Sequence, residues 1–362
     1  MNVRWMGLLL FAFTLLSGAI SNLTAANAAE TCVYVSDAGT QSIVLYHFDE
    51  ESGKLKEVTR TNVGTAPGSL FVHADSRLLF ASLRTNAEVG SYKIGDAGKL
   101  TLVNKTELGS GANAAYVAAD KAGNHLYAAS YSAGRVTMHN IADDGKLSGA
   151  VVQTIETAKT AHAAVLTADQ KWLFVPHVQP NAIYQFKVDS KTGKLTEAGK
   201  AAGGKEGSGP RHLAIHPSQK FAFSSDESGS SVTLYSLDAE KGLQPLQTLS
   251  TLPADFTAKN STADVHVHPS GEFVWVSNRG HDSLAGFRFD AAAAKLTALG
   301  QTPTEKTPRS FAVAPNGKWI LGAGEGSGKL AVFAIDVKTG QLERQETVEV
   351  GKSLTWVTIV RL

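Results

Sequence analysis

One phrase, Gly-Lys-Leu or a close variant, recurs along this chain at nearly constant spacing. The leucines of its seven copies are 45, 47, 48, 48, 53 and 46 residues apart. A period in the forties that persists to the end of a chain is typical of a solenoid, a propeller or another array. Length alone would suggest two or three domains for 362 residues, and the repeat overrides that estimate. The copies are Gly53-Lys54-Leu55, Gly98-Lys99-Leu100, Gly145-Lys146-Leu147, Gly193-Lys194-Leu195, Lys241-Gly242-Leu243, Ala294-Lys295-Leu296 and Gly340-Gln341-Leu342.

The content of each repeat predicts β-strands. Residues 213–238 read LAIHPSQKFAFSS, then a polar loop, then SVTLYSLD, and the stretches from Val265 and Phe311 follow the same plan. The apolar runs are short, rich in aromatic and β-branched residues, and separated by turn residues. A further strand is expected after each Gly-Lys-Leu turn, and no stretch shows the period of an amphipathic helix. Four strands in each of seven units predict an all-β chain folded as a seven-bladed β-propeller.

The two ends of the repeat array predict how the ring closes. Residues 31–36 begin in mid-blade, and residues 354–360 resemble an unpaired first strand. Together the N- and C-terminal strands would complete one four-stranded blade and hide the last sheet edges. We therefore expect residues 30–362 to form a single propeller domain. Since a closed ring leaves no free edge for pairing, a monomer is expected.

Residues 1–29 predict a secretory signal peptide. Arg4 precedes an apolar run over residues 8–20, and Ala26-Asn27-Ala28 forms an A-x-A cleavage site. The apolar run is shorter than the roughly 20 residues of a comfortable membrane span. We expect cleavage after Ala28 or Ala29 and a periplasmic or secreted protein with no membrane attachment, rather than an uncleaved anchor.

Charge and cysteine content exclude several classes of partner. Lysine and arginine number 34 against 33 acidic residues, a formal net charge of +1. That balance gives no field strong enough to hold nucleic acid or an anionic membrane by charge alone. The only cysteine, Cys32, excludes an internal disulfide framework and a cysteine-rich zinc site.

Two further patterns could suggest a ligand site, and both are better explained by the scaffold. His73, His216 and His268 occupy one register of the repeat, and only His268 has the neighbour His266 that would make an H-x-H metal pair. The glycine-rich stretch at residues 322–328 is followed by a strand, whereas a phosphate loop needs a helix start behind it. We therefore expect no metal and no cofactor.

Positions whose chemistry differs between repeats point to the functional site. In each repeat, the position five residues before the histidine register is the start of the innermost strand, whose side chains should line the central channel. The position eleven residues after the register is the start of the loop that follows the second strand. Charged residues recur at both positions without a scaffold pattern. We expect two charged rings at one mouth of the channel. The first ring is Gly68, Asn113, His162, Arg211, Ala263 and Arg309, and the second is Arg84, Ala129, Val178, Glu227, Arg279 and Glu325.

Four of these residues, from adjacent blades, form a candidate catalytic group: His162, Arg211, Glu227 and Arg279. Arginines offer planar forks that bind carboxylate or phosphate. A glutamate and a histidine can move protons. The group predicts a small anionic or polyhydroxylated ligand with acid–base catalysis, and the alternative is a set of salt bridges between blades with no catalysis.

Three motifs carry a family resemblance over about residues 31–362: Gly209-Pro210-Arg211-His212, Ser277-Asn278-Arg279-Gly280-His281-Asp282-Ser283 and Thr307-Pro308-Arg309. They resemble signatures of the seven-bladed propeller lactonases, which include propeller-type bacterial 6-phosphogluconolactonases and fungal carboxymuconate-lactonizing enzymes. The resemblance implies an active site made of the same four residues, His162, Arg211, Glu227 and Arg279. The candidate substrate-binding residues are Asn113, Arg309, His281 and Glu325.

The chain departs from the family pattern at two places near the expected channel mouth. Where the family usually has Pro-Asp-x-Gly, this chain has Pro176-His177-Val178-Gln179, and where the family's last-blade loop has Asn-Gln, this chain has Gly324-Glu325-Gly326. Both changes bear on the identity of the substrate.

The resemblance and the ring residues together predict hydrolysis of a sugar lactone to its aldonic acid. The arginines would hold the substrate oxygens and stabilise the oxyanion, while Glu227 or His162 acts as general base and the other as acid. No G-x-S-x-G motif is present, which argues against a covalent acyl-enzyme. Export favours an unphosphorylated lactone such as gluconolactone over its 6-phospho form. The alternatives are a non-enzymatic propeller that binds a ligand or protein at its face, and a muconate-cyclising enzyme whose arginines hold a dicarboxylate.

Overall fold

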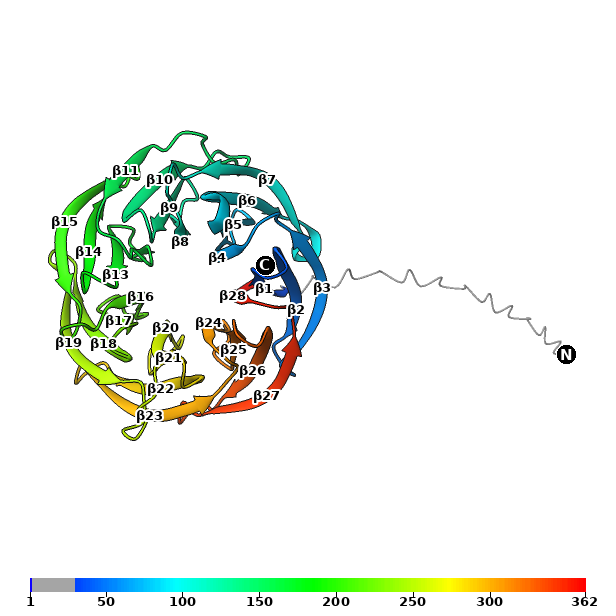
Figure 1. Ribbon diagram of the computed structural model, residues 1–362. Helices are drawn as coiled ribbons and strands as arrows, with labels where there is room; N and C mark the ends of the chain where they lie inside the picture. The colour runs from blue at the N-terminus through cyan, green and yellow to red at the C-terminus, as the bar shows by residue number, and fades with distance from the viewer. Residues whose placement is uncertain (2–29) are drawn as a thin grey trace.

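The chain forms a ring of seven four-stranded antiparallel sheets around a central axis in a computed structural model that describes Met1 and residues 30–362 (Figure 1). The predicted all-β, seven-bladed propeller is confirmed. Apart from Met1, the predicted signal peptide lies outside the described residues. Within residues 30–362, no helix is long and apolar enough to cross a membrane.

The strands follow one plan, in which chain order within a blade runs from the axis outward. In the first blade, which contains both chain ends, they are β28 (Leu354–Arg361), β1 (Thr31–Asp37), β2 (Ser42–Asp49) and β3 (Lys54–Asn62). The second blade has β4 (Pro67–His73), β5 (Leu78–Leu83), β6 (Glu88–Ile94) and β7 (Leu100–Glu107), with short 3₁₀ turns η1 (Arg84–Asn86) and η2 (Asp96–Gly98). The third blade has β8 (Ala114–Ala119), β9 (His125–Ser130), β10 (Arg135–Asn140) and β11 (Gln153–Glu156), and the fourth has β12 (Val165–Leu166), β13 (Trp172–His177), β14 (Ala182–Val188) and β15 (Leu195–Ala202). The fifth has β16 (Pro210–Ile215), β17 (Phe221–Asp226), β18 (Ser231–Asp238) and β19 (Gly242–Ser250), and the sixth has β20 (Ser261–Val267), β21 (Phe273–Arg279), β22 (Ser283–Asp290) and β23 (Lys295–Pro303). The seventh has β24 (Pro308–Val313), β25 (Trp319–Gly324), β26 (Lys329–Ile335) and β27 (Leu342–Glu349).

The two chain ends close the ring as predicted. In Figure 1 the last strand, β28, lies beside the first, β1, at the inner edge of the same blade. Their antiparallel register pairs Thr31 with Arg361 and runs to Asp37 opposite Leu354. Closure therefore depends on hydrogen bonds between residues more than 300 positions apart in sequence.

Apolar contacts between neighbouring blades form the core. Seven clusters of buried apolar side chains occupy the seven interfaces of the ring among the described residues. One of them joins Val33 and Val44 of the first blade to Leu321 and Val332 of the seventh, so the closing interface has a core like the others. The second strand of each blade lies between two such clusters, which explains its nearly continuous apolar sequence.

The Gly-Lys-Leu repeat marks the place where each blade's outer turn contacts its neighbour. Gly98 adopts a positive φ of 76°, and a Cβ there would come within 2.6 Å of Cys32 Sγ in the first blade. Tyr34 Oη donates a hydrogen bond to the Gly98 carbonyl at 2.7 Å. A side chain at Gly98 would be strained twice, by the backbone angle and by the contact, so glycine recurs there.

The register histidines fasten neighbouring blades, which supports the scaffold interpretation. His216 accepts a hydrogen bond from Ser218 Oγ (2.8 Å) at Nδ1, and its Nε2 donates to the Gly271 carbonyl of the next blade (3.1 Å). His268 and His73 each contact a serine of their own turn and a carbonyl of the next blade in the same way. With both ring nitrogens used, these histidines are structural clamps between blades.

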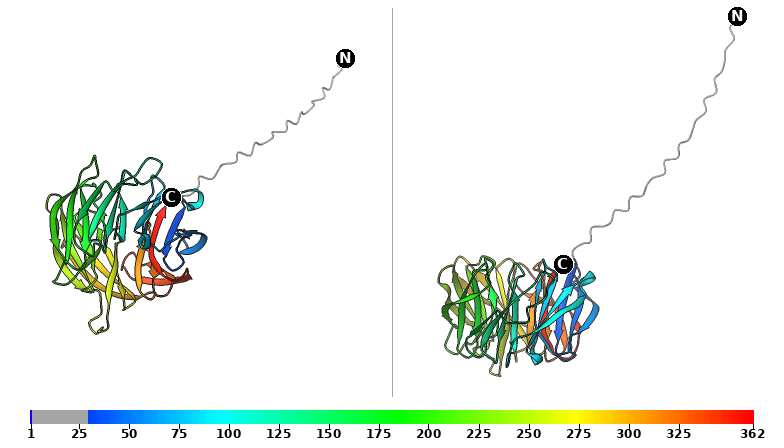
Figure 2. Two further views of the ribbon diagram at one scale, coloured as in Figure 1. Left: turned by 45° about the horizontal axis from the view of Figure 1, so that its top comes forward. Right: turned by 90° about the horizontal axis from the view of Figure 1, so that it is seen from above.

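The strands run between two rims of a thick disc, as the side view in Figure 2 shows. The histidine clamps lie in the turns between the first and second strands and so define one rim. At the other end of the same two strands, Pro210 pairs with Asp226, and Glu227 N donates to the Gly209 carbonyl at 2.8 Å. That second rim carries both predicted charged rings, and we call it the site rim.

Candidate active site

A narrow cavity opens on the axis at the site rim. Its wall contains Arg84, His162, Arg211 and Arg309, with the indole of Trp356 and the small residues Gly68, Ser69, Ala115 and Thr355. About 10 Å³ is free inside it, roughly the room that one water molecule needs. A substrate larger than water would therefore sit at the mouth of the cavity rather than inside it.

Arg211, in β16, is the most deeply buried charge of the wall, with 1% of its surface exposed. Its Nη1 donates to the Ala263 carbonyl at 2.5 Å and to His212 Nε2 at 3.1 Å. Burial and the neighbouring charges of Arg279 and Arg309 lower the pKa of Arg211, yet a guanidinium remains protonated in proteins. Arg211 is thus a fixed positive charge at the axis.

Glu227, just after β17, joins two of the arginines. Its Oε1 accepts a hydrogen bond from Arg279 Nη2 at 2.7 Å, and its Oε2 lies 3.7 Å from Arg211 Nε. Burial raises the pKa of Glu227, but the charges of Arg211 and Arg279 outweigh it and hold the pKa below the usual range. Glu227 is therefore ionised at neutral pH and acts as the shared counter-charge of the two guanidiniums.

His162 lies in the cavity wall and is 5% exposed. Its Nδ1 is buried and has no hydrogen-bond partner among the described residues. Burial, and then the charge of Arg211, lower the pKa of His162 well below the ordinary histidine value. The imidazole is therefore neutral at pH 7 and retains a lone pair that can accept a proton.

Two functional candidates escaped the sequence analysis: His212 and Asp264. His212 Nδ1 lies 2.8 Å from Asp264 Oδ1, and its Nε2 accepts the hydrogen bond from Arg211. Burial and Arg211 lower the pKa of His212 to about 4, so the neutral ring donates from Nδ1 and accepts at Nε2. The backbone N–H groups of Val265 and Phe311 also donate to Asp264. This Asp–His–Arg chain fixes the orientation of Arg211.

An aromatic cluster closes the channel beneath the cavity. The rings of His212 and Trp356 pack at a tilt of 54° with centroids 5.6 Å apart, and Tyr116 contacts both edge-on, at 5.6 and 5.4 Å. His162 joins the cluster through His212 at 5.2 Å. Because these side chains come from four different blades, they meet on the axis, and the site is a pocket with a floor.

The remaining ring residues form a second charged group beside the first. Arg309 Nη1 lies 3.3 Å from Glu325 Oε2, and Arg84 Nε donates to Asn113 Oδ1 at 2.7 Å. Burial and the charge of Arg309 lower the pKa of Arg84. The structure places Arg309 in the cavity wall and Glu325 and Asn113 as partners of wall arginines. In the third blade the wall residue is Ala115, two positions after the Asn113 indicated by the register count.

Two residues from the sequence analysis lie elsewhere. His281 packs edge-on against Phe256 and bonds Ser283 Oγ at 2.7 Å, and it is absent from the cavity wall. His177, expected at the channel mouth, is fully buried, and its nitrogens contact the Val175 carbonyl of its own strand and Thr157 Oγ1 in the loop after β11. Burial lowers the pKa of His177 to about 4, so it is a neutral structural residue.

The H-x-H pair does not form a metal site. His266 Nε2 lies 3.3 Å from Asp264 Oδ2, whereas His268 is bonded to Ser270 and to the next blade. The two imidazoles therefore serve different partners. Around the cavity itself, the four guanidiniums of Arg84, Arg211, Arg279 and Arg309 favour an anion over a cation.

The propeller has an arginine-lined cavity with a neutral imidazole in its wall, and the Glu227 carboxylate is paired with one of the wall arginines. These are the features of a small-molecule enzyme. The family model for "Lactonase, 7-bladed beta-propeller" matches residues 30–359. The chain belongs to this seven-bladed propeller lactonase family and is a carboxylic ester hydrolase.

Its relatives agree over nearly the full length. A 6-phosphogluconolactonase of Pectobacterium carotovorum is 30% identical over 332 residues, 91% of this chain and 98% of that protein. A 6-phosphogluconolactonase of Photorhabdus laumondii is also 30% identical, with 91% and 99% covered. Among solved structures, the periplasmic gluconolactonase PpgL of Pseudomonas aeruginosa has a TM-score of 0.83 at 26% identity, covering 92% of this chain and 99% of that one.

Proposed function

We propose that this protein hydrolyses a sugar lactone, of the gluconolactone or 6-phosphogluconolactone type, to the aldonic acid at the mouth of its central channel. The observation that carries the proposal is that His162 and Arg211 share the wall of an axial cavity with room for about one water molecule. Arg211 in turn shares the Glu227 carboxylate with Arg279. The names of the relatives support the substrate class.

In the proposed mechanism, the arginines stabilise the oxyanion that forms on the lactone carbonyl. Arg211 cannot turn away, because its contacts to Ala263 and His212 hold it in place. Preorganised charge of this kind is typically the largest contribution to acyl transfer. The guanidiniums supply the positive charge that a metal would supply elsewhere, so the proposed reaction needs no metal.

His162 is the better placed general base of the two candidates. It lines the cavity as a neutral imidazole with an unpartnered nitrogen, whereas Glu227 is engaged by two arginines, which weakens it as a base. His162 would take a proton from water as the water attacks the carbonyl carbon, and the ring oxygen would leave as an alkoxide that receives the proton. Glu227 would hold the two guanidiniums in register.

The predicted compartment favours one of the two substrates. The predicted signal peptide favours an unphosphorylated lactone outside the cytosol, and the structural neighbour PpgL is named a periplasmic gluconolactonase. The curated relatives are named for the 6-phospho substrate. We propose a periplasmic or secreted gluconolactonase as the leading assignment.

A panel of lactones tests the proposal. Purified protein is assayed by acid release against δ-gluconolactone, its 6-phospho form and a muconolactone, each corrected for spontaneous hydrolysis. We expect hydrolysis well above background, fastest for δ-gluconolactone, and a loss of at least about tenfold in Glu227→Gln. Background rates for every lactone would overturn the proposal and favour a binding platform.

The pH profile tests the base. Lowered pKa values for His162 and Glu227 mean that both groups lose their protons at a lower pH than usual, so the basic forms persist into acid. We expect kcat/KM for δ-gluconolactone, followed by polarimetry, to stay within about twofold between pH 7 and 5.5. An acidic limb with a midpoint near the ordinary histidine value of about 6.5 would contradict a buried base. The unphosphorylated substrate is used because a phosphate would titrate in the same range.

A further inference from the structure

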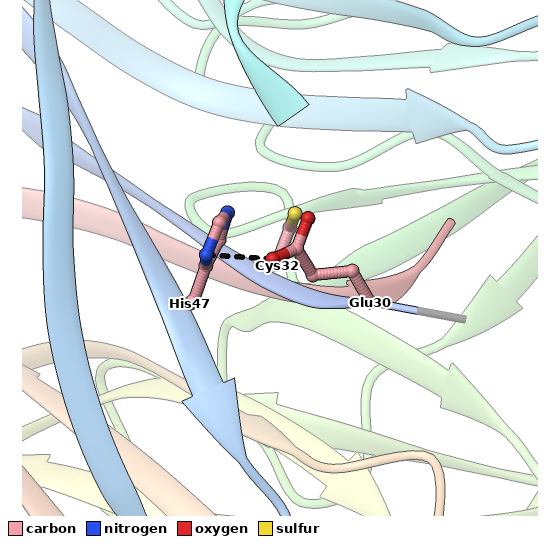
Figure 3. A group of neighbouring side chains, drawn as sticks. All are labelled: Glu30, Cys32 and His47. Carbon is pink, nitrogen blue, oxygen red and sulfur yellow. Dashed lines mark ion pairs between the residues drawn. The ribbon is translucent and has the colours of Figure 1, made fainter. Parts of the chain in front are cut away.

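On the rim opposite the cavity, three potential metal ligands share one face of the first blade. Cys32 of β1 and His47 of β2 are directly opposite in the antiparallel register, and Glu30 precedes Cys32 by two residues, which places it on the same side. Figure 3 shows the three side chains directed toward one another. The Cys32 Sγ, a ring nitrogen of His47 and a carboxylate oxygen of Glu30 all lie within 4.8 Å of one another.

The contacts of His47 leave Nδ1 as the nitrogen that could bind a metal. Its Nε2 lies 3.0 Å from the Ala97 carbonyl, which can only accept, so Nε2 carries a proton. Its Nδ1 lies 2.7 Å from a carboxylate oxygen of Glu30. A contact of this length holds a proton between nitrogen and oxygen, and a bound metal ion would displace that proton. A histidine that donates its far N–H to a backbone carbonyl is also the usual arrangement of a metal ligand.

We propose that Glu30, Cys32 and His47 bind a divalent cation of the zinc class, with one coordination position left for water. Thiolate, imidazole and carboxylate together are ligands that Zn²⁺ accepts in tetrahedral sites. Bond lengths of about 2.0–2.3 Å place the ligand atoms roughly 3.3–3.7 Å apart. To reach this spacing, the Glu30 carboxylate oxygen and His47 Nδ1 would move apart by less than about 1 Å, and Cys32 Sγ would move closer to both.

The site has an access route and a movable ligand. Glu30 and His47 line a surface cleft of about 700 Å³, and their side chains are 43% and 25% exposed, whereas Cys32 is fully buried beneath them. On binding, the Cys32 S–H bond breaks, a metal–sulfur bond forms, and the proton passes to water. Cleavage after either Ala28 or Ala29 would leave Glu30 in the mature chain.

Cobalt(II) is the probe that distinguishes this site from adventitious binding, because thiolate coordination gives a near-ultraviolet charge-transfer band. The protein carries no polyhistidine tag and is first freed of metal with a chelator. We expect one Co²⁺ per chain, with that band and the visible bands of a four-coordinate ion, and displacement by Zn²⁺. Zn²⁺ should also raise the unfolding temperature, since it binds only the folded chain.

Variants locate the ligands. Cys32→Ala should abolish the charge-transfer band, and His47→Gln, a partly exposed and mild change, should weaken Zn²⁺ binding by at least about tenfold. His125→Gln is the matched control, because His125 also faces a carboxylate, that of Asp120 at 2.6 Å, but is not one of the three clustered ligands. No charge-transfer band in the wild type, or equal Zn²⁺ affinity in His47→Gln and His125→Gln, overturns the proposal. Lactonase activity is a separate readout, so this site and the proposed function can fail independently.

Discussion

Arg211→Lys is expected to lower kcat/KM for the preferred lactone by about 10²–10³-fold, mainly through kcat. Lysine keeps the charge but lacks the planar guanidinium, whose Nη1 donates to Ala263 and His212 while Nε lies beside Glu227. An ammonium has one nitrogen and cannot keep all of these contacts, so the charge would no longer be held in the direction of the developing oxyanion. Steady-state kinetics and thermal unfolding of the same preparation separate a catalytic loss from a folding defect.

The matched control is Arg288→Lys. Arg288 also donates to a backbone carbonyl, that of Lys338 at 2.6 Å, but lies on the third strand of its blade, away from the axis. The Arg288→Lys variant should therefore retain wild-type kinetics. If Arg211→Lys kept more than half of the wild-type kcat/KM, Arg211 would be a structural residue and oxyanion stabilisation would have to come from elsewhere.

Deletion of residues 354–362 is expected to prevent formation of a stable folded monomer. The deleted strand pairs with β1 along its length and carries Leu354 and Val357, which are 0% and 2% exposed. Burial of these two side chains alone contributes about 3–6 kcal/mol, comparable with the whole stability of a typical domain. The loss also exposes the edge of β1 to other chains.

Circular dichroism and size-exclusion chromatography check this expectation. The truncated chain should aggregate or show no cooperative transition, while deletion of Leu362 alone should unfold like the wild type. A truncated monomer that still unfolds cooperatively near the wild-type temperature would show that the other six blades are sufficient without ring closure.

The repeat made the fold predictable. Each copy samples the same scaffold, so a glycine such as Gly98 or a histidine such as His216 recurs for a physical reason that a single copy would not reveal. The same comparison located His162, Arg211 and Arg309, because polar groups on innermost strands break the pattern of the other copies.

The register count could not place every side chain, because it assumed regular strands. In β16 the pairing shifts between Pro210 and His212, a β-bulge. Neighbouring residues of a regular strand point to opposite faces, but a bulge redirects a side chain, and here both Arg211 and His212 lie at the axis. His212 was thus missed, together with its partner Asp264, which is distant in sequence. His281 was named from a motif rather than from geometry, and it lies outside the cavity wall.

The histidine clamps and the charged rings lie at opposite ends of the same strands. The residues that keep the fold together are thus separated from those that surround the candidate active site. Residues that fasten the blades, such as His216 and His268, bond to carbonyls of the next blade and are not part of the cavity wall. Loops on the site rim, such as Gly324-Glu325-Gly326, can therefore exchange side chains at little cost to the ring. Members of one scaffold can diversify in substrate on one rim while the other keeps the blades together.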